Sequence, residues 1–439
     1  MVELVGSHRL QIREVILKDG KTFLLLVSLL VVTYVWPLRV ISDSKIAYPI
    51  MGAIVALVFL TRLSARVSAW LSVYLAAIAM AGSLHIAVLG SSAYFWLSLS
   101  TYLVIPFVCG RKVLDEEKFD RLMLGLSVTA IPNLAGLIAQ MAGYQSDFLV
   151  EEFTMTLGNV HVRYTSLVGG ALGLGMISAL TAVSAAYWLV ARRQYWIYNL
   201  LVFAASITCL YFSYSRRAYV FALLGLVIIA WSTRRSHRDV IAKVVVLVAA
   251  AGAVVVAIAL GHLDGLLNRL WSIAVFAAED DGLRVTKWLQ ALTTIAAHPI
   301  LGVGFGGSGT IGRDPAELVD FQSFLTAESY YLQMAMEGGV LVGIVVFLTI
   351  TCTAFKSLTR LRYRPATLLT TTFLVCFAVE SFPGTSLTSP LVAIIFWLAF
   401  GINHSSTVAR SDDHTRIRNS LPLHSDMNDG VRASGSQPT

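Results

Sequence analysis

Two acidic side chains, Glu328 and Glu337, lie in the otherwise apolar segment TAESYYLQMAMEGGVLVG. An ionisable side chain is costly inside a membrane, so such residues are usually paired or functional. On a continuous helix their spacing corresponds to roughly two and a half turns, which places them on opposite faces and excludes a paired acid and base. Glu328 begins the apolar run and is the candidate general base, or else an acid stabilised by the helix dipole. We expect Glu337 to be a structural acid.

A second group of candidates consists of the arginines Arg163, Arg216, Arg217 and Arg284, which lie at or near the ends of apolar runs. Guanidinium groups bind phosphate oxygens bidentately and stay charged at any working pH. Together these arginines indicate an anion site in the headgroup layer, with Arg216, Arg284 and Arg163 preferred in that order. Arg217 points about 100° away from Arg216 on a helix, so only one of the two need face the site. The alternative is snorkelling or ion pairing with neighbouring acids.

The segment DDGLRVTKWLQALTTIAAHP predicts an amphipathic helix that begins after Asp281 and ends before Pro299. Its predicted apolar stripe consists of Val285, Trp288, Leu289, Leu292, Ile295 and Ala296. Arg284 then lies in the first turn, where free N–H groups and the helix dipole favour phosphate. The alternative is an interfacial helix whose basic residues contact lipid headgroups.

The next segment, HPILGVGFGGSG, formally satisfies the GxGxxG pattern with Gly302, Gly304 and Gly307. A dinucleotide site is excluded because no βαβ context surrounds the pattern. Two interpretations remain: a glycine-rich turn that brings the backbone close to a ligand, or a flexible re-entry into the membrane. His298 is an alternative base, or else a cap at the helix end.

The elements that must position these residues are membrane helices. Of 439 residues, 56% are hydrophobic and 13% are charged, with a mean hydropathy of +0.71. Repeated long apolar runs predict an all-α polytopic membrane protein and exclude a β-barrel, whose strands would alternate. Hydropathy predicts about twelve spans. They lie near residues 22–41, 46–61, 68–90, 92–109, 122–141, 165–190, 195–213, 217–232, 242–260, 328–352, 366–381 and 387–403.

Basic residues cluster in alternate connections, which predicts that both termini are cytoplasmic and explains the net charge of +7 without nucleic acid. Two long acidic connections, 142–164 and 261–327, then lie on the far side and carry the candidate site. The predicted domains are an N-terminal transmembrane bundle (1–260), a large periplasmic loop with amphipathic helices (261–327), C-terminal transmembrane helices (328–403) and a disordered cytoplasmic tail (404–439).

The order of these motifs over residues 160–345 resembles that of the bacterial O-antigen polymerase/ligase superfamily. The matching pieces are Arg163, the Ser215–Arg216 pair in YSRRAYVFALLGL, Arg284 and Trp288 in LRVTKWLQAL, HPILGVGFG, and ESYYLQMAMEGG. The resemblance implies a GT-C-type glycosyltransferase of the bacterial inner membrane that uses undecaprenyl-pyrophosphate-linked glycans. It also implies an active site that faces the periplasm and a chain-length regulator as a candidate partner.

The ligases of this superfamily have a histidine where this chain has Glu328, whereas Ser329, Leu332, Glu337 and Gly339 keep the family spacing. This departure favours a polymerase of O-antigen or exopolysaccharide repeat units. The alternatives are a ligase that transfers the glycan to lipid A core and a transporter of lipid-linked oligosaccharides. A transporter would more often show related halves, and no convincing internal repeat is present.

The chemistry that the resemblance implies needs stabilisation of a departing pyrophosphate and activation of an acceptor hydroxyl. We expect the arginines to serve the first task and Glu328 the second, in a direct displacement that inverts the anomeric centre. No cofactor or metal is expected, because the adjacent Asp280 and Asp281 have no third ligand in evidence. Tyr330 and Tyr331 suit either sugar stacking or an interfacial aromatic belt.

Overall fold

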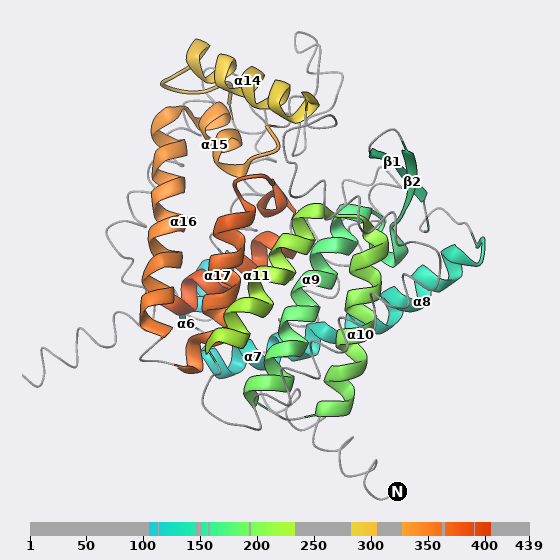
Figure 1. The fold of residues 1–439 in the computed structure, drawn as a ribbon. Coiled ribbons are helices and arrows are strands. Elements are labelled where there is room, and N and C mark those ends of the chain that lie inside the picture. The colour runs from blue at the N-terminus through green and yellow to red at the C-terminus, as the bar shows by residue number, and fades with distance from the viewer. Residues whose placement is uncertain are drawn as a thin grey trace, which may run out of the picture.

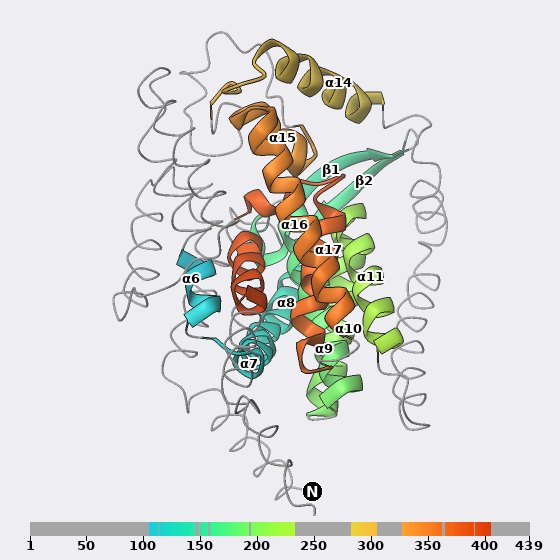
Figure 2. The ribbon, with the colours of Figure 1, turned by 90° about the vertical axis from the view of Figure 1, so that its left-hand side faces the viewer.

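The computed structural model describes residues 105–112, 114–144, 149, 151–156, 159–192, 195–232, 282–304, 327–361, 365–389 and 391–404. Within these residues the protein is mainly helical (Figure 1). Long helices pack side by side, and α14 (Gly282–Ala297) lies across one end of them (Figures 1 and 2). We name this end of the bundle the α14 end.

Four stretches among the described residues are long and apolar enough to cross a membrane, which makes the chain a membrane protein. They are Glu116–Met141 (α7 Glu116–Leu126, η2 Ser127–Thr129 and α8 Ala130–Met141), Ala171–Arg192 (α9 Ala171–Tyr187 and η4 Trp188–Arg192), Trp196–Ser213 (α10) and Val340–Leu361 (α16). Shorter elements complete the bundle. They are α6 (Ile105–Lys112), η3 (Ser166–Val168), α11 (Arg216–Ser232), α15 (Tyr330–Gly338), η6 (Pro365–Thr367), α17 (Leu368–Glu380), η7 (Ser386–Thr388) and the helix Leu391–His404.

The predicted class, a helical membrane protein, is confirmed in this coarse form. The predicted spans near 22–41, 46–61, 68–90 and 242–260, and most of 92–109, lie outside the described residues. The total of about twelve spans, the extent of the large loop and the four domain boundaries therefore stay predictions.

The purely α-helical expectation is wrong in one connection, which folds into a β-hairpin. Strands β1 (Glu151–Thr156) and β2 (Asn159–Tyr164) pair antiparallel, with Glu152 opposite Arg163. Two residues join the strands, and β-branched or aromatic side chains alternate with polar ones along β2. This short period-two pattern is typical of a hairpin.

Helix α9 lies at the centre of the bundle and is almost wholly buried. Its sequence is rich in Ala, Gly, Ser and Thr, and small residues let membrane helices approach closely. A Cβ added to Gly175 would come within 2.6 Å of the Ser215 Cβ, and one added to Gly225 of α11 would come equally close to Val183. The sequence of α9 therefore permits the tight α9–α11 contact that fixes where α11 begins.

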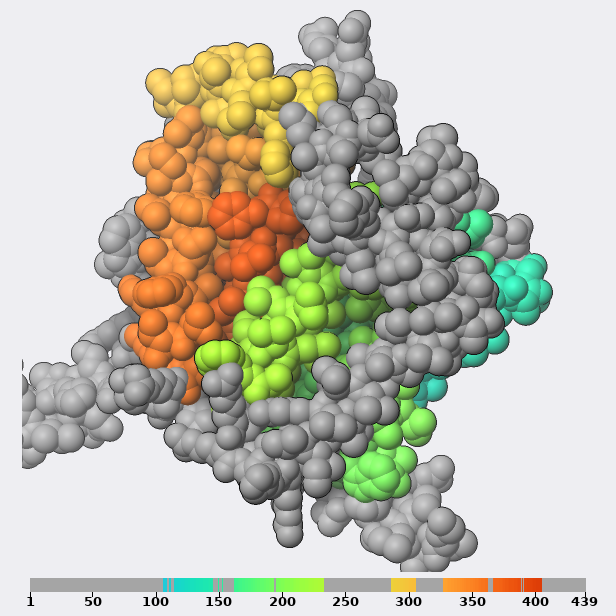
Figure 3. All heavy atoms as spheres, in the orientation of Figure 1, coloured from blue at the N-terminus to red at the C-terminus, as the bar shows by residue number. Residues whose placement is uncertain are grey.

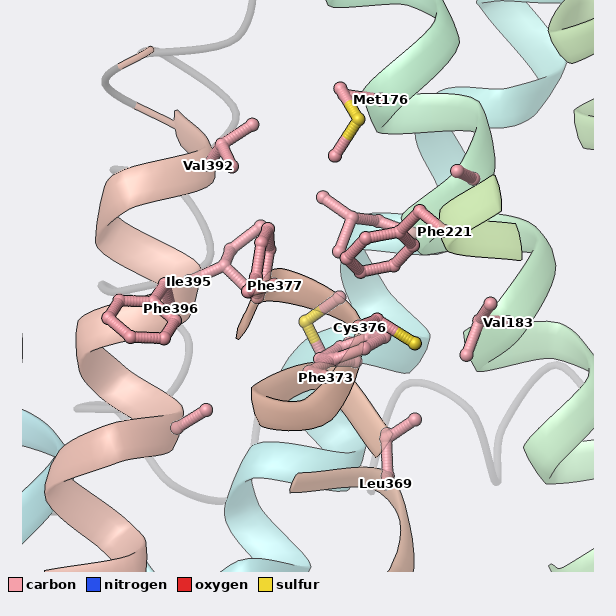
Figure 4. Packing of buried hydrophobic residues seen from close by; sticks show 14 of the residues in the cluster. Met176, Val183, Phe221, Leu369, Phe373, Cys376, Phe377, Val392, Ile395 and Phe396 are labelled. Carbon is pink, nitrogen blue, oxygen red and sulfur yellow. The ribbon is translucent and has the colours of Figure 1, made fainter. Parts of the chain in front are cut away.

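Aromatic side chains join α11, α17 and the helix Leu391–His404 (Figure 4). The ring centroids of Phe221 and Phe377 are 4.8 Å apart, and those of Phe377 and Phe396 are 5.6 Å apart. Both pairs have the edge-to-face geometry that aromatic rings prefer. This packing holds the start of α11 and the end of α17 at the same end of the bundle.

The end of the bundle opposite α14 contains an ion pair whose acidic member is buried. Asp120 of α7 is fully buried, and its Oδ2 accepts hydrogen bonds from Tyr187 Oη at 2.6 Å and from Arg192 Nη2 at 2.7 Å. Arg192 Nε also donates to Tyr187 Oη at 3.0 Å. The last turn of α9 widens into a π-helix at Trp188–Arg192, which carries Arg192 to this contact. The cluster joins α7 to α9 far from α14.

Candidate active site

Glu328 lies immediately before Ser329, the N-cap of α15, and has a left-handed backbone conformation, with φ of 45°. For a residue with a Cβ this conformation costs about 1–2 kcal/mol, so its surroundings must hold it in place. Ser329 caps α15 by accepting a hydrogen bond from the Leu332 N–H. The Tyr330 N–H donates to the Ser381 carbonyl at 3.0 Å and to the Gly384 carbonyl at 2.8 Å. The start of α15 is therefore fixed to the loop that follows α17.

The carboxylate of Glu328 forms an ion pair with Lys287 of α14, with 2.7 Å between Nζ and Oε1. Each side chain keeps about a third of its surface exposed. The sequence places Lys287 outside the predicted apolar stripe of this helix and does not reveal its partner, which lies 41 residues later. The structure thus adds a basic residue to the candidate site.

The predicted helix is confirmed as α14. The side that faces the protein carries Ala291 and Ile295, which pack with Ala327 and Met336. Leu289 and Leu292 of the predicted apolar stripe are 59% and 50% exposed and face away from the protein. Lys287 lies four residues before Ala291, on the same side of α14, where it reaches Glu328.

Backbone hydrogen bonds fix the other end of α14 to the end of α15. Val303 N donates to the Met336 carbonyl at 2.9 Å, and Gly304 N donates to the Glu337 carbonyl at 3.0 Å. Val340 N donates to the Pro299 carbonyl at 2.9 Å. In the described residues, the glycine-rich HPILGVG segment thus meets the backbone at the α15–α16 junction.

The apolar run near 328–352, predicted as one span, divides at this junction into α15 and α16. Gly339 separates the two helices and has φ of 88°. Glu337, just before the break, is buried and accepts a hydrogen bond from Gln333 Nε2 at 3.1 Å. This environment agrees with the structural role expected for Glu337.

Arg163 is held in a polar contact at the start of α9. Its Nε donates to the Ser213 carbonyl at 3.3 Å, and its Nη1 lies 4.0 Å from Glu152 Oε2 in the opposite strand. Glu152 Oε1 also accepts a hydrogen bond from the Ala171 N–H at the start of α9. Burial lowers the pKa of the Arg163 guanidinium; Glu152 opposes this effect and the nearby Arg217 adds to it.

Arg217 has a buried acidic partner, Glu380 at the end of α17, with 3.9 Å between Nη1 and Oε1. Glu380 also accepts a hydrogen bond from Ser386 Oγ at 2.6 Å. Glu380 is not among the residues that the sequence predicts for the site. The sequence feature that could have indicated Glu380 is an acid at the end of the apolar run 366–381, followed by the turn-forming residues SFPG. The residue after it, Ser381, is the one whose carbonyl anchors the start of α15.

Arg216 is the first residue of α11 and is half-buried, and Arg284 is the third residue of α14. Both thus lie in the first turn of a helix at the α14 end, where the backbone favours anions. Asp281, the predicted N-cap of α14, and Asp280 lie outside the described residues. Within the described ranges, no three His, Cys, Asp or Glu side chains are grouped so that they could hold a metal ion.

The remaining candidates are placed as follows. Tyr330 and Tyr331 are buried; Tyr331 Oη donates to the Ala378 carbonyl at 2.9 Å, and its ring packs on Phe347 and Phe382. Both rings therefore lie in the protein interior. His298 follows α14 and is exposed, and its backbone N–H extends the helix by bonding the Thr294 carbonyl.

Two charged groups thus lie at the α14 end, and the loop after α17 connects them. One group is the Lys287–Glu328 pair, and the other contains Glu152, Arg163, Arg217 and Glu380. Figure 3 shows α14 (yellow) against the orange residues of α15 and α16. These features define a class: a helical membrane protein with two groups of acidic and basic side chains at one end of its bundle.

Comparisons with known proteins show what the chain is similar to. Residues 200–348 match the family model described as O-antigen ligase, a range that contains Arg216, Lys287 and Glu328. An O-antigen ligase of Pseudomonas aeruginosa is 25% identical over 310 residues, which cover 66% of this chain and 69% of that protein. The O-antigen polymerase/ligase superfamily, predicted from the order of the motifs, is therefore confirmed.

Proposed function

We propose that the protein transfers a glycan from an undecaprenyl-pyrophosphate donor to a sugar hydroxyl, at the α14 end of the bundle and on the periplasmic side of the inner membrane. The observation that carries this proposal is the position of Glu328. It is partly exposed, is fixed at the start of α15, and lies beside the loop that joins it to the Arg217–Glu380 pair. The excess of basic residues in the opposite connections supports this orientation.

In the proposed reaction Glu328 accepts the proton of the acceptor hydroxyl while the acceptor oxygen attacks the anomeric carbon. The bond between that carbon and the pyrophosphate oxygen breaks, and its electron pair leaves with the lipid pyrophosphate. One direct displacement inverts the anomeric centre. Cationic side chains stabilise the charge that develops on the leaving group.

The arginines divide into two kinds in this proposal. Arg163 and Arg217 have acidic partners, Glu152 and Glu380, which hold the two guanidinium groups in place and offset their charge. We assign Arg216 and Arg284, the two arginines that the sequence ranks first, to direct contact with the pyrophosphate at the starts of α11 and α14. The proposed donor site therefore combines direct ligands with a fixed electrostatic background.

For the acceptor we propose a growing polysaccharide chain, so that the enzyme is a polymerase of O-antigen or exopolysaccharide repeat units. The support is Glu328, which occupies the position where ligases of the superfamily have a histidine. The second candidate is transfer to lipid A core. It is favoured by the family description O-antigen ligase and by the name of the Pseudomonas aeruginosa relative.

The test uses purified full-length protein and an undecaprenyl-pyrophosphate-linked oligosaccharide, first alone and then with lipid A core. Longer chains from the donor alone support the polymerase. Product that forms only after lipid A core is added overturns the polymerase in favour of the ligase. If no product forms under either condition, the polymerase and the ligase are both contradicted and a transporter is favoured. Transport would then be measured as flux of the same donor across vesicle membranes.

A further inference from the structure

The two ends of α14 are held in different ways. Near its C-terminal end, three backbone hydrogen bonds join residues 299–304 to residues 336–340. Near its N-terminal end, the described residues include the Lys287–Glu328 ion pair. Between the two ends, the described residues form the small apolar cluster of Ala291, Ile295, Ala327 and Met336, with partly buried residues around it. The helix is therefore firmly held at one end and held by exchangeable charges at the other.

The Lys287–Glu328 pair has the properties of a contact that an anion can displace. Both side chains are about one-third exposed, so a ligand can reach them from solvent. Ion pairs with this degree of exposure are weak, because water and salt compete for both charges. A pyrophosphate has more negative charge than one carboxylate and presents several acceptor oxygens, so it competes well for an ammonium group.

A second observation shows that the polar contacts of α14 are incomplete. The indole N–H of Trp288, the residue after Lys287, is buried and has no hydrogen-bond acceptor among the described residues. Buried donors are normally paired, and an exception indicates strain or a ligand. Lys287 and Trp288 thus place an exchangeable cation and a donor without an acceptor in the same turn.

We propose that Lys287 is a donor-binding residue whose ammonium exchanges the Glu328 carboxylate for a phosphate oxygen of the lipid pyrophosphate. This inference rests on the proposed function of the site. Binding of the donor then has a second effect, because it removes the Lys287 contact from the Glu328 carboxylate that is to meet the acceptor hydroxyl. The exchange makes the base available only when the leaving group is already bound, which prevents unproductive activation of water.

The exchange is tested by measuring binding of undecaprenyl pyrophosphate without a glycan to the full-length protein in nanodiscs. Lys287→Met should weaken binding about tenfold, the scale of one lost charge-assisted hydrogen bond. Glu328→Gln should tighten binding about two- to fivefold, because the carboxylate no longer competes for Lys287. The double variant should bind like Lys287→Met, and Lys287→Arg should bind like the wild type.

Lys118→Met is the matched control. Lys118 is exposed to a similar degree and pairs with Asp115 at the start of α7, away from α14, so its loss should leave binding unchanged. The inference is overturned if Lys287→Met binds with wild-type affinity. It is also overturned if Glu328→Gln still tightens binding in a protein that lacks Lys287. The binding assay requires no catalysis, so the proposed function is tested separately. That function fails if Glu328→Gln lengthens chains at the wild-type rate.

Discussion

Gly302 and Gly339 belong to two segments whose backbones touch. A Cβ added to Gly302 would come within 2.5 Å of the Glu337 carbonyl oxygen, and one added to Gly339 would come within 2.2 Å of the Ile300 carbonyl oxygen. Real Cβ atoms do not approach other atoms so closely, so both positions require glycine. Gly302 of HPILGVG and Gly339, two residues after Glu337, thus lie at one junction between the two segments. This junction fixes α14 relative to α15.

Gly339→Ala should lower the stability of the protein by about 2 kcal/mol or more, since it adds both backbone strain and a collision. Gly143→Ala is the control for strain alone, because Gly143 has a similar φ of 86° and a Cβ added there would have no atom within 4 Å. Thermal unfolding in one detergent should show a larger decrease in Tm for Gly339→Ala. Equal decreases would mean that the contact with Ile300 contributes nothing.

The sequence predicts α14 well, because helical periodicity is a local signal, whereas the roles of the candidate arginines stay predictions. The sequence does not predict which side of α14 faces the protein, for a physical reason. Periodicity assumes that a charged residue faces water, whereas Lys287 faces Glu328. That pairing depends on two residues 41 positions apart, and no local pattern encodes it.

Glu380 shows the same limit for the candidate site. An acid at the end of an apolar run is typical of the boundary of a span. For its partner Arg217, the sequence indicates only that one of the two adjacent arginines need face the site, and it ranks Arg216 higher. Only the packing of α11 against α17, through Phe221 and Phe377, brings the two charges together. The hairpin escapes a hydropathy scan because strands of six residues average out in the span-length window that finds membrane helices.

Glu328→Gln should lower the rate of chain lengthening by about 10²- to 10⁴-fold, the range for loss of a general base. Glu337→Gln is the matched control, since Glu337 is buried and bonds to Gln333 one turn earlier in the same helix. Its rate per folded molecule should stay within about tenfold of the wild type. Product measured by gel for equal amounts of folded protein gives both rates. A glutamine at 328 that left the rate unchanged would remove Glu328 from the mechanism.

Glu328→His should retain measurable transfer and change its pH dependence. A base works only when deprotonated, so activity is lost as pH falls through the pKa of the base. A free imidazole has a pKa about two units above that of a free carboxylic acid, so the acidic limb of the pH profile should move to higher pH. The measurement is the initial rate between about pH 4 and pH 8. An unchanged acidic limb would show that residue 328 does not accept the proton.

Asp120→Ala should destabilise the protein by about 1–3 kcal/mol, because it removes the buried acid to which Tyr187 and Arg192 both donate hydrogen bonds. Asp115→Ala is the comparison, since it removes the exposed N-cap of α7 at a cost of about 1 kcal/mol. The rate of chain lengthening per folded molecule should stay unchanged in both variants, because both residues lie far from α14. A selective loss of rate in Asp120→Ala would link this end of the bundle to catalysis.

Arg216→Met and Arg217→Met should separate donor binding from stability. Arg217→Met leaves Glu380 buried without its cation, at a cost of about 2 kcal/mol or more, and the double variant Arg217→Met with Glu380→Leu should recover most of that loss. Arg216→Met should instead raise the donor KM about tenfold, the scale of one lost charge-assisted contact, with a smaller change in Tm. If Arg216→Met lowered Tm as far as Arg217→Met while leaving the donor KM unchanged, Arg216 would be a structural residue and not a donor ligand.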